Sequence, residues 1–466
     1  MRWFVVLSAA LALSACSSSS GTGNDASVDA ADSRAGDGAA GPETMVDSAR
    51  VDGTDVPPDP CEGLGPECLP LVERGSIKVV YLHGTPYEMG FQHGTLLHEE
   101  LAAGVVEIQE DLTLSTMMAL AEKSGLVELA MERSLPEITE ECQGLVDAAG
   151  DIGWTMNHCM VLNFGDAVAE FLQHGMPEGG DIQPGCAQAI VSGAATADGA
   201  TYQLRILDWA LIQFIVDNPV VFVRQPEGKI PHVFVGFPGN LSPYTGMNGK
   251  GLVSASNEVS PLDNDCHDSV GVSHVQLQAR ILAEASDLAE AEAMVKSANH
   301  MTLELFGVSD PTGGEIFEMA PAAVAFRKQV EGVVYATNHF EAPETDAHDK
   351  AQSKHSTLRY DRLSQLLDPG GKDSLYGTLS PEVLVKVARD RINPYDGTES
   401  PGSEFDNGES IATNGALFVV VFDPSKLRFW VAAGALPVPS QPFVGFSLGE
   451  LLGWPGYEGA TPEDIL

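Results

Sequence analysis

The stretch Asp181–Trp209, DIQPGCAQAIVSGAATADGATYQLRILDW, marks the point at which the pattern of the chain changes. Before Cys186, as far as Met160, apolar residues recur three and four positions apart, which is typical of amphipathic helices. After Cys186, short β-rich runs follow one another, joined by Asp-Gly, Pro-Glu-Gly and Pro-Thr-Gly-Gly turns that favour antiparallel hairpins. Helical pairs interrupt these runs near 272–298 and 356–391. The sequence therefore predicts an α+β fold with antiparallel sheets stacked face to face and helices outside.

The composition excludes one class of partner. The chain has 466 residues, 44% of them hydrophobic, so it can bury a large core. Its 25 Lys and Arg residues against 66 Asp and Glu residues give a net charge of −41. Such a charge repels phosphate backbones, and we therefore expect no nucleic acid partner.

The N-terminus is typical of an exported lipoprotein. A basic residue precedes the apolar run Trp3–Leu13, which is too short to span a bilayer and predicts a signal peptide over residues 1–15. The following Cys16 completes the motif LSAC, which resembles a bacterial lipobox and implies lipidation of Cys16 with diacylglycerol and a further acyl chain such as palmitate. Two or three acyl chains together anchor a protein stably to a membrane. An ordinary signal peptide cut near Ala15 is the alternative.

The rest of the chain divides into a tether and a folded part. Residues 16–73 predict an acidic low-complexity tether, because Ser, Gly, Ala, Asp and Pro cannot bury enough apolar surface to fold. Ser17 after the lipidated residue favours the outer membrane, so we expect a lipid-anchored protein of the cell envelope on its periplasmic or surface face. Residues 74–185 predict a helical N-terminal part, and residues 186–466 predict the catalytic part.

The chain holds 7 cysteines, and export permits disulfides. Cys61 with Cys68 and Cys142 with Cys159 are plausible pairs, although the sequence does not fix the pairing. This count leaves Cys266 over and is compatible with a free thiol at Cys186.

A catalytic cysteine requires a base, because the thiolate is the nucleophile. If the Gly185–Cys186 bond is cut, the new α-amino group, with a pKa of about 7.7 to 8, lies on the same residue as the sulfur and can accept its proton. Arg205 can hold the thiolate or a substrate carboxylate, and Asp208 can accept from the α-ammonium group. A strand would place these two side chains on opposite faces unless it bulges or ends there.

Four motifs occur in the chain in a fixed order: GTPYEMGFQHGTLL, GCAQAIVSGAATADGATYQLRILDW, GMNGKGLVSASNE and ATNHF. Together they resemble the N-terminal-nucleophile (Ntn) hydrolases of the peptidase C45 group, the self-processing acyltransferases and amidases typified by isopenicillin N acyltransferase. The resemblance covers roughly Ile77 to Gly434. It implies a four-layer αββα sandwich, no cofactor, a small-molecule amide substrate, and a precursor that cuts itself into a heterodimer of a small and a large subunit.

The resemblance also implies roles for individual residues. Cys186 is the nucleophile, freed by cleavage after Gly185, and Arg205 and Asp208 match the Arg-x-x-Asp that follows it. Asn257 and Asn338 match two asparagines that stabilise the oxyanion or orient the amine. Arg359 matches a later arginine that positions substrate or nucleophile, with Arg362 as the alternative. We expect cleavage of a linear amide through a thioester, with hydrolysis favoured over transfer because water is plentiful in the envelope.

Two other classes of function remain open. The first is a lipid-anchored binding protein that has the fold without the activity. The second is a cysteine hydrolase in which Cys186 stays uncut and His339 or His232 serves as the base. We expect no metal site, because His83 and His93 lack a third ligand at a suitable spacing.

Overall fold

The computed structural model describes residues 71–165, 185–209, 211–260, 270–349, 353–400 and 410–466. The predicted signal peptide, Cys16, nearly all of the tether, and Cys61, Cys68 and Cys266 lie outside these ranges. Within them, no helix combines the length and the apolar character needed to cross a bilayer.

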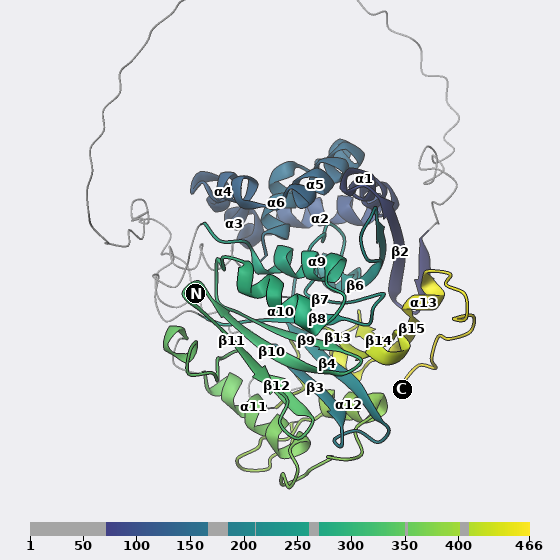
Figure 1. The fold of residues 1–466 in the computed structure, drawn as a ribbon. Helices are drawn as coiled ribbons and strands as arrows, with labels where there is room; N and C mark the ends of the chain where they lie inside the picture. The colour runs from purple at the N-terminus through teal and green to yellow at the C-terminus, as the bar shows by residue number, and fades with distance from the viewer. Residues whose placement is uncertain (1–70, 166–184, 210, 261–269, 350–352, 401–409) are drawn as a thin grey trace, which may run out of the picture.

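The strands form two sheets (Figure 1). The larger sheet contains, in spatial order, β1 (Val72–Arg74), β2 (Ile77–Gly84), β5 (Val220–Pro226), β6 (His232–Gly236), β7 (Thr245–Asn248), β8 (Val253–Glu258), β9 (Glu304–Asp310), β10 (Gly313–Ala320) and β11 (Ala323–Lys328). The smaller sheet contains β12 (Val333–Ala336), β3 (Ala187–Gly193), β4 (Gly199–Asp208), β13 (Ala416–Asp423), β14 (Arg428–Ala433) and β15 (Val444–Ser447).

The two sheets pack face to face through buried apolar side chains. In one shared cluster, Val221 and Val233 of the larger sheet pack with Phe418 and Val431 of the smaller one, and Cys186 is a member of this cluster. Burial of such a cluster is the main force that holds the sheets together.

Helices cover the outer face of each sheet. On the outer side of the larger sheet lie α1 (Pro86–Leu96), α9 (His274–Glu284) and α10 (Leu288–Ser297), and on the outer side of the smaller sheet lie α11 (Lys354–Leu367) and α12 (Pro381–Ala388). The predicted α+β class and αββα layering are confirmed.

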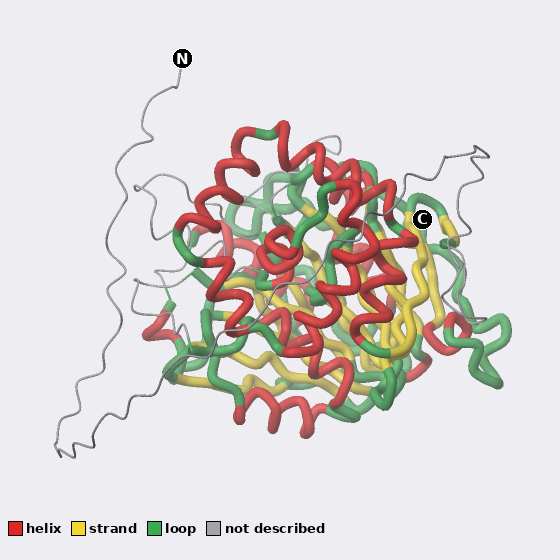
Figure 2. The backbone as a smooth tube through the Cα atoms, turned by 90° about the horizontal axis from the view of Figure 1, so that it is seen from above, coloured by secondary structure: helices red, strands yellow, loops and turns green. Residues whose placement is uncertain are grey.

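The remaining N-terminal helices form a separate group over one end of the molecule. They are α2 (His98–Glu110), α3 (Leu112–Lys123), α4 (Leu126–Arg133), α5 (Pro136–Ala149) and α6 (Met156–Asn163). Figure 2, viewed from that end, shows them lying over the strands. The short helices α8 (Gln213–Asp217) and α13 (Leu448–Leu451) complete the described elements of this kind.

One strand pairing differs from the sequence prediction, which expected antiparallel sheets. β2 pairs with β5 in parallel, with Lys78 opposite Val220. Parallel neighbours need a long crossover, and here the chain passes through the N-terminal helices and the β3–β4 hairpin before it returns to the sheet. The hairpin signals that we used report only pairings between strands that are close in sequence.

Helices α1 and α5 approach each other closely because both carry glycine at the contact. A methyl group at Gly90 would overlap the main-chain carbonyl of Glu141, and one at Gly144 would overlap the carbonyl of Tyr87. A disulfide between Cys142 and Cys159 then ties α5 to α6, which is one of the pairings that the sequence left open. These contacts connect α1, α5 and α6.

Candidate active site

Cys186 lies directly before β3, with only 4% of its surface exposed. It is the free cysteine among the residues that the structure describes. β3 and β4 form the predicted hairpin, with Gln188 opposite Arg205, so the start of β3 lies beside the end of β4. This pairing brings Arg205 and Asp208 next to the thiol.

The thiol has two polar contacts. Arg205 Nη2 lies 3.3 Å from Cys186 Sγ, and Sγ lies 3.5 Å from the main-chain carbonyl of Asp208. The guanidinium of Arg205 is completely buried and also donates to the carbonyl oxygens of Ile206 and Ser256. The Arg205 guanidinium therefore lies directly beside the sulfur.

The Asp208 carboxylate lies against the Gly185–Cys186 peptide. A methyl group at Gly185 would overlap one carboxylate oxygen, and a methyl group at Gly415 would overlap the other. The hydroxyl of Thr413 donates to Oδ2. Burial raises the pKa of the Asp208 carboxyl, while the bond to Thr413 and the charge of Arg359 act in the opposite direction.

Arg205 and Asp208 do not need to share a face of β4 in order to reach Cys186. Arg205 extends toward the larger sheet, where it meets Ser256 of β8, whereas Asp208 is bound by Thr413. The strand pairing of β4 with β13 is irregular at this end, since a β-bulge separates Ala416 from Phe418. Cys186 thus lies at the end of the hairpin, where side chains from both faces of β4 converge.

Arg359 reaches the site from the smaller sheet's outer helix, α11. Its Nη1 donates to the carbonyl of Cys186, and its Nη2 donates to Asn338 Oδ1 at 2.8 Å. Burial lowers the pKa of the Arg359 guanidinium to about 10, against the opposing charge of Asp208. Arg362, the alternative, instead binds Asp390 and Asp373.

The two predicted oxyanion asparagines differ in their bonding. Asn257 Nδ2 donates to the carbonyl oxygens of Thr337 and Ala336, at 2.7 and 3.5 Å, so these carbonyls occupy the donor side of its amide. Asn338 Nδ2 donates to the Glu258 carbonyl at 2.9 Å and, as an amide nitrogen, carries a second N–H. The oxyanion role of either residue stays a prediction.

The histidines considered as external bases have other partners. His339 Nδ1 lies 2.7 Å from Ser356 Oγ, and its Nε2 lies 2.9 Å from Glu341 Oε1. His232 Nδ1 lies 3.0 Å from the Ile230 carbonyl, and burial lowers the pKa of His232 to about 3. Among the described residues, neither is a hydrogen-bond partner of the Cys186 thiol.

A small cavity lies beside the thiol. Besides Cys186, Arg205 and Asp208, its lining includes residues that sequence reasoning did not select: Leu207, Trp209, Tyr244, Ser256 and Glu258. The rings of Trp209 and Tyr244 pack against each other with their centroids 5.9 Å apart. The sequence places Trp209 at the end of the Arg-x-x-Asp strand, which was the available signal for it. Nothing comparable marks Tyr244.

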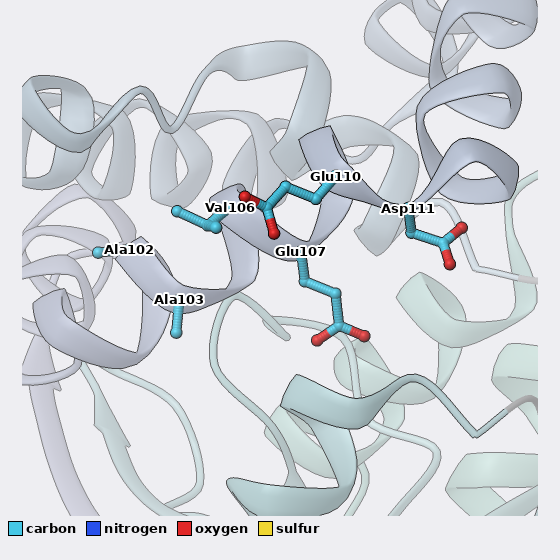
Figure 3. Close-up of a pocket in the computed structure, with 6 residues that line it drawn as sticks. All are labelled: Ala102, Ala103, Val106, Glu107, Glu110 and Asp111. Carbon is cyan, nitrogen blue, oxygen red and sulfur yellow. The ribbon is translucent and has the colours of Figure 1, made fainter.

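A second, more open hollow lies on the surface of α2, away from the thiol. Figure 3 shows its lining, which consists of Ala102, Ala103, Val106, Glu107, Glu110 and Asp111. The residues that line it do not line the Cys186 cavity. No group of three or more metal-ligating side chains occurs within the described ranges.

Two proteins have related sequences. An uncharacterized protein of Archaeoglobus fulgidus is 25% identical over 400 residues, which cover 78% of this chain and 64% of that protein. Protein dcd1B of Dictyostelium discoideum is 24% identical over 204 residues, which cover 38% of each chain. The chain therefore spans less than two thirds of the length of either relative.

Several solved structures are similar at low identity. They include an N-acylethanolamine-hydrolyzing acid amidase ortholog from Caenorhabditis elegans (12% identity, 51% of this chain and 93% of that chain, TM-score 0.35). A mutant conjugated bile acid hydrolase from Clostridium perfringens matches at 13% identity, with 57% and 93% coverage and a TM-score of 0.34. Penicillin V acylase from Agrobacterium tumefaciens matches at 15% identity, with 53% and 83% coverage and a TM-score of 0.31.

A family model matches part of the chain directly. Residues 212–435 match the model described as acyl-coenzyme A:6-aminopenicillanic acid acyl-transferase. The matched range contains Asn257, Asn338 and Arg359 and begins after Cys186. Residues 212–435 of this chain are therefore similar to the acyl-coenzyme A:6-aminopenicillanic acid acyl-transferase family.

Proposed function

We propose that this protein is a self-processing Ntn cysteine amidase that cleaves a linear amide bond through a thioester on Cys186. The family match supports an amide hydrolase or an acyltransferase. The observation that carries the cysteine assignment is the buried Cys186 thiol, 3.3 Å from the Arg205 guanidinium and directly after a glycine that packs on the Asp208 carboxylate.

Self-processing begins with attack of the Cys186 sulfur on the carbonyl carbon of Gly185. The peptide C–N bond breaks, a thioester forms between Gly185 and the sulfur, and the nitrogen leaves as the free amine of Cys186. Water then hydrolyses the thioester, which leaves a carboxylate on Gly185 and the thiol on Cys186. The Asp208 carboxylate, which packs against Gly185, can accept a hydrogen bond from the new ammonium group.

Turnover repeats this chemistry on a substrate. The α-amine accepts the thiol proton, the sulfur attacks the amide carbonyl, and the leaving amine takes the proton as the acyl-thioester forms. Water resolves the thioester in a hydrolase, and an acceptor amine resolves it in a transferase. The second N–H of Asn338 is our candidate oxyanion donor, and loss of such a donor raises the barrier by about 2.7 to 4 kcal/mol.

The remaining assignments belong to the same proposal. Cleavage gives a small subunit that ends at Gly185 and a large subunit that begins at Cys186, held together as a heterodimer. Cys16 carries the lipid anchor, and the protein faces the periplasm or the cell surface from the outer membrane. The substrate is a small-molecule amide.

Denaturing electrophoresis with N-terminal sequencing tests the processing step. We expect two fragments, the larger of which begins at Cys186, and a single chain in Cys186→Ala. Cys266→Ala is the matched control and should process normally. An intact chain that still hydrolyses amides would support an external base, and an intact chain without activity would support a binding protein.

A panel of N-acyl amino acids, penicillin V and N-acyl sphingosine then tests the activity itself. Turnover of a panel member by the wild type, lost in Cys186→Ala, is the expected result. Processing without turnover of any linear amide in a wider acyl series would contradict the amidase assignment while leaving the cleavage chemistry intact.

A further inference from the structure

The loop between β6 and β7, residues 237–244, connects the N-terminal helices to the Cys186 cavity. Its last residue, Tyr244, lines the cavity. Several of its backbone groups are bound by side chains that precede Cys186 in the chain. This is unusual, because loops more often use solvent or their own side chains as partners.

Asn163, at the end of α6, makes most of these bonds and is completely buried. Its Oδ1 accepts from the main-chain N–H of Leu241 at 2.6 Å and of Ser242 at 3.2 Å. Its Nδ2 donates to the Gly239 carbonyl at 2.9 Å, and to the Cys159 carbonyl of its own helix at 3.0 Å. The amide of Asn163 therefore uses both its donor and its acceptor sides to fix the loop.

His93 of α1 binds the same loop. Its Nε2 accepts from the Gly239 N–H at 2.9 Å, which fixes the neutral form with the acceptor on that nitrogen. Burial lowers the pKa of His93 to about 3, in agreement with a neutral ring. Gly239 has a positive φ of 84° and packs against the ring of Trp154, so the loop follows a path that the N-terminal helices shape closely.

A second segment beside the cavity is held in the same way. Both carboxylate oxygens of Glu107 on α2 accept main-chain N–H groups at the start of α8, from Gln213 at 2.9 Å and from Phe214 at 2.7 Å. The Phe214 ring packs on Gly104 of α2. In Figure 3 the Glu107 side chain points away from Glu110 and toward a neighbouring helix. This segment follows Trp209, the second aromatic residue of the cavity.

Tyr244 ends the first segment, and its ring packs against that of Trp209, which precedes the second segment. We propose that Asn163 and Glu107 are positioning residues that set this aromatic wall, so that the part of the chain before Cys186 determines which acyl group the cavity accepts. Rings of this kind favour an apolar or aryl acyl chain. The identity of the ligand, an acyl group, rests on the proposed amidase function. The contacts of Asn163 and Glu107 with the two segments do not depend on whether the protein hydrolyses amides.

Kinetics with fluorogenic N-acyl-7-amino-4-methylcoumarins, from acetyl to decanoyl, tests the proposal. Asn163→Asp keeps the acceptor for Leu241 and loses the donor to Gly239, and Glu107→Gln leaves one N–H of α8 without its acceptor. In both variants we expect KM for the decanoyl substrate to rise roughly tenfold or more, since a buried bond is lost, while kcat changes little. The preference for long over short acyl chains should fall.

Matched controls lie on the same two helices. Asn157 on α6 donates to Glu122, and the Glu110 side chain on α2 points away from that of Glu107 in Figure 3, so Asn157→Asp and Glu110→Gln should leave the selectivity unchanged. A purely structural role predicts a lower melting temperature with unaltered acyl preference, and that result in both variants would overturn the proposal. A double-mutant cycle of Asn163→Asp with Tyr244→Leu should be non-additive if Asn163 acts through Tyr244.

A readout that needs no turnover separates this inference from the proposed function. N-decylmaleimide and N-ethylmaleimide alkylate thiols, and mass spectrometry of the Cys186 peptide gives the rate for each reagent. The ratio of the two rates should fall in Asn163→Asp and Glu107→Gln relative to the wild type. If the wild type hydrolyses no amide, the amidase proposal fails, and an unchanged ratio in both variants would still overturn the inference on its own.

Discussion

Arg359 provides the sharpest test of the site, because the structure distinguishes it from its neighbour Arg362. The guanidinium of Arg359 is completely buried and donates to the Cys186 carbonyl and to Asn338. Arg359→Met keeps an unbranched stem and removes both bonds. We expect self-processing to slow strongly and kcat/KM on any amide substrate to fall.

The expected loss follows from the two bonds. A hydrogen bond that involves a charged group contributes about 1.5 to 3 kcal/mol, so the pair contributes about 3 to 6 kcal/mol. At about 1.4 kcal/mol for each factor of ten, kcat/KM should fall by about 10² to 10⁴. Arg359→Lys can restore only one of the two contacts at a time, so its kcat/KM should lie between the values for the wild type and Arg359→Met.

The assay measures processing on a denaturing gel and amide turnover per folded molecule, with folding checked by thermal unfolding. Arg362→Met is the control, since Arg362 lies on the same helix but binds Asp390 and Asp373. That variant should lose stability by about 1 to 3 kcal/mol and keep kcat/KM within about threefold. If Arg362→Met loses activity while Arg359→Met keeps it, our assignment of the arginine is wrong.

Three further predictions concern glycines and a buried acid. Gly185→Ala should slow self-processing roughly a hundredfold, because its methyl group displaces the Asp208 carboxylate; normal cleavage on a gel would contradict this. Gly144→Ala should lower the unfolding free energy by about 1 to 3 kcal/mol, whereas Gly150→Ala, which meets open space, should change it by less than about 0.5 kcal/mol in denaturant titration. Burial and then neighbouring carboxylates raise the pKa of Asp349 to about 7, against a bond from a main-chain N–H. The protonated form therefore favours the folded state, so stability should decline by on the order of 1 to 3 kcal/mol as the pH rises from about 4 to 7, and Asp349→Asn should remove that decline.

Local signals predicted the hairpin that contains the candidate nucleophile. Two β-rich runs after Cys186, with an Asp-Gly turn between them, predicted two strands. In the structure these strands are 187–193 and 199–208. The β2–β5 pairing escaped prediction because the two strands are far apart in sequence and no turn links them. Its direction depends on the path of the whole chain between them.

The site was predictable in its residue types and less so in its geometry. Cys186, Arg205 and Asp208 lie together because the hairpin register brings them there, and this register follows from the turn. The alternation of strand side chains seemed to separate Arg205 from Asp208. The conflict disappears because Cys186 lies at the open end of the hairpin and β4 ends at Asp208, which was the exception that the sequence analysis allowed. Tyr244 was missed because an aromatic residue before a strand is usually part of the core.

The parallel pairing of β2 with β5 has a consequence for the cut form of the molecule that we propose. The piece that precedes Cys186 contributes β1 and β2, the two strands at one edge of the larger sheet, and its apolar residues Val80 and Leu82 are completely buried. Release of that piece would expose the edge of β5 and these apolar residues, so the cut protein should stay together for as long as it stays folded. Once the cut protein unfolds, however, its two pieces would have to meet by diffusion. Refolding would then be slower than for the uncut chain and would depend on the protein concentration.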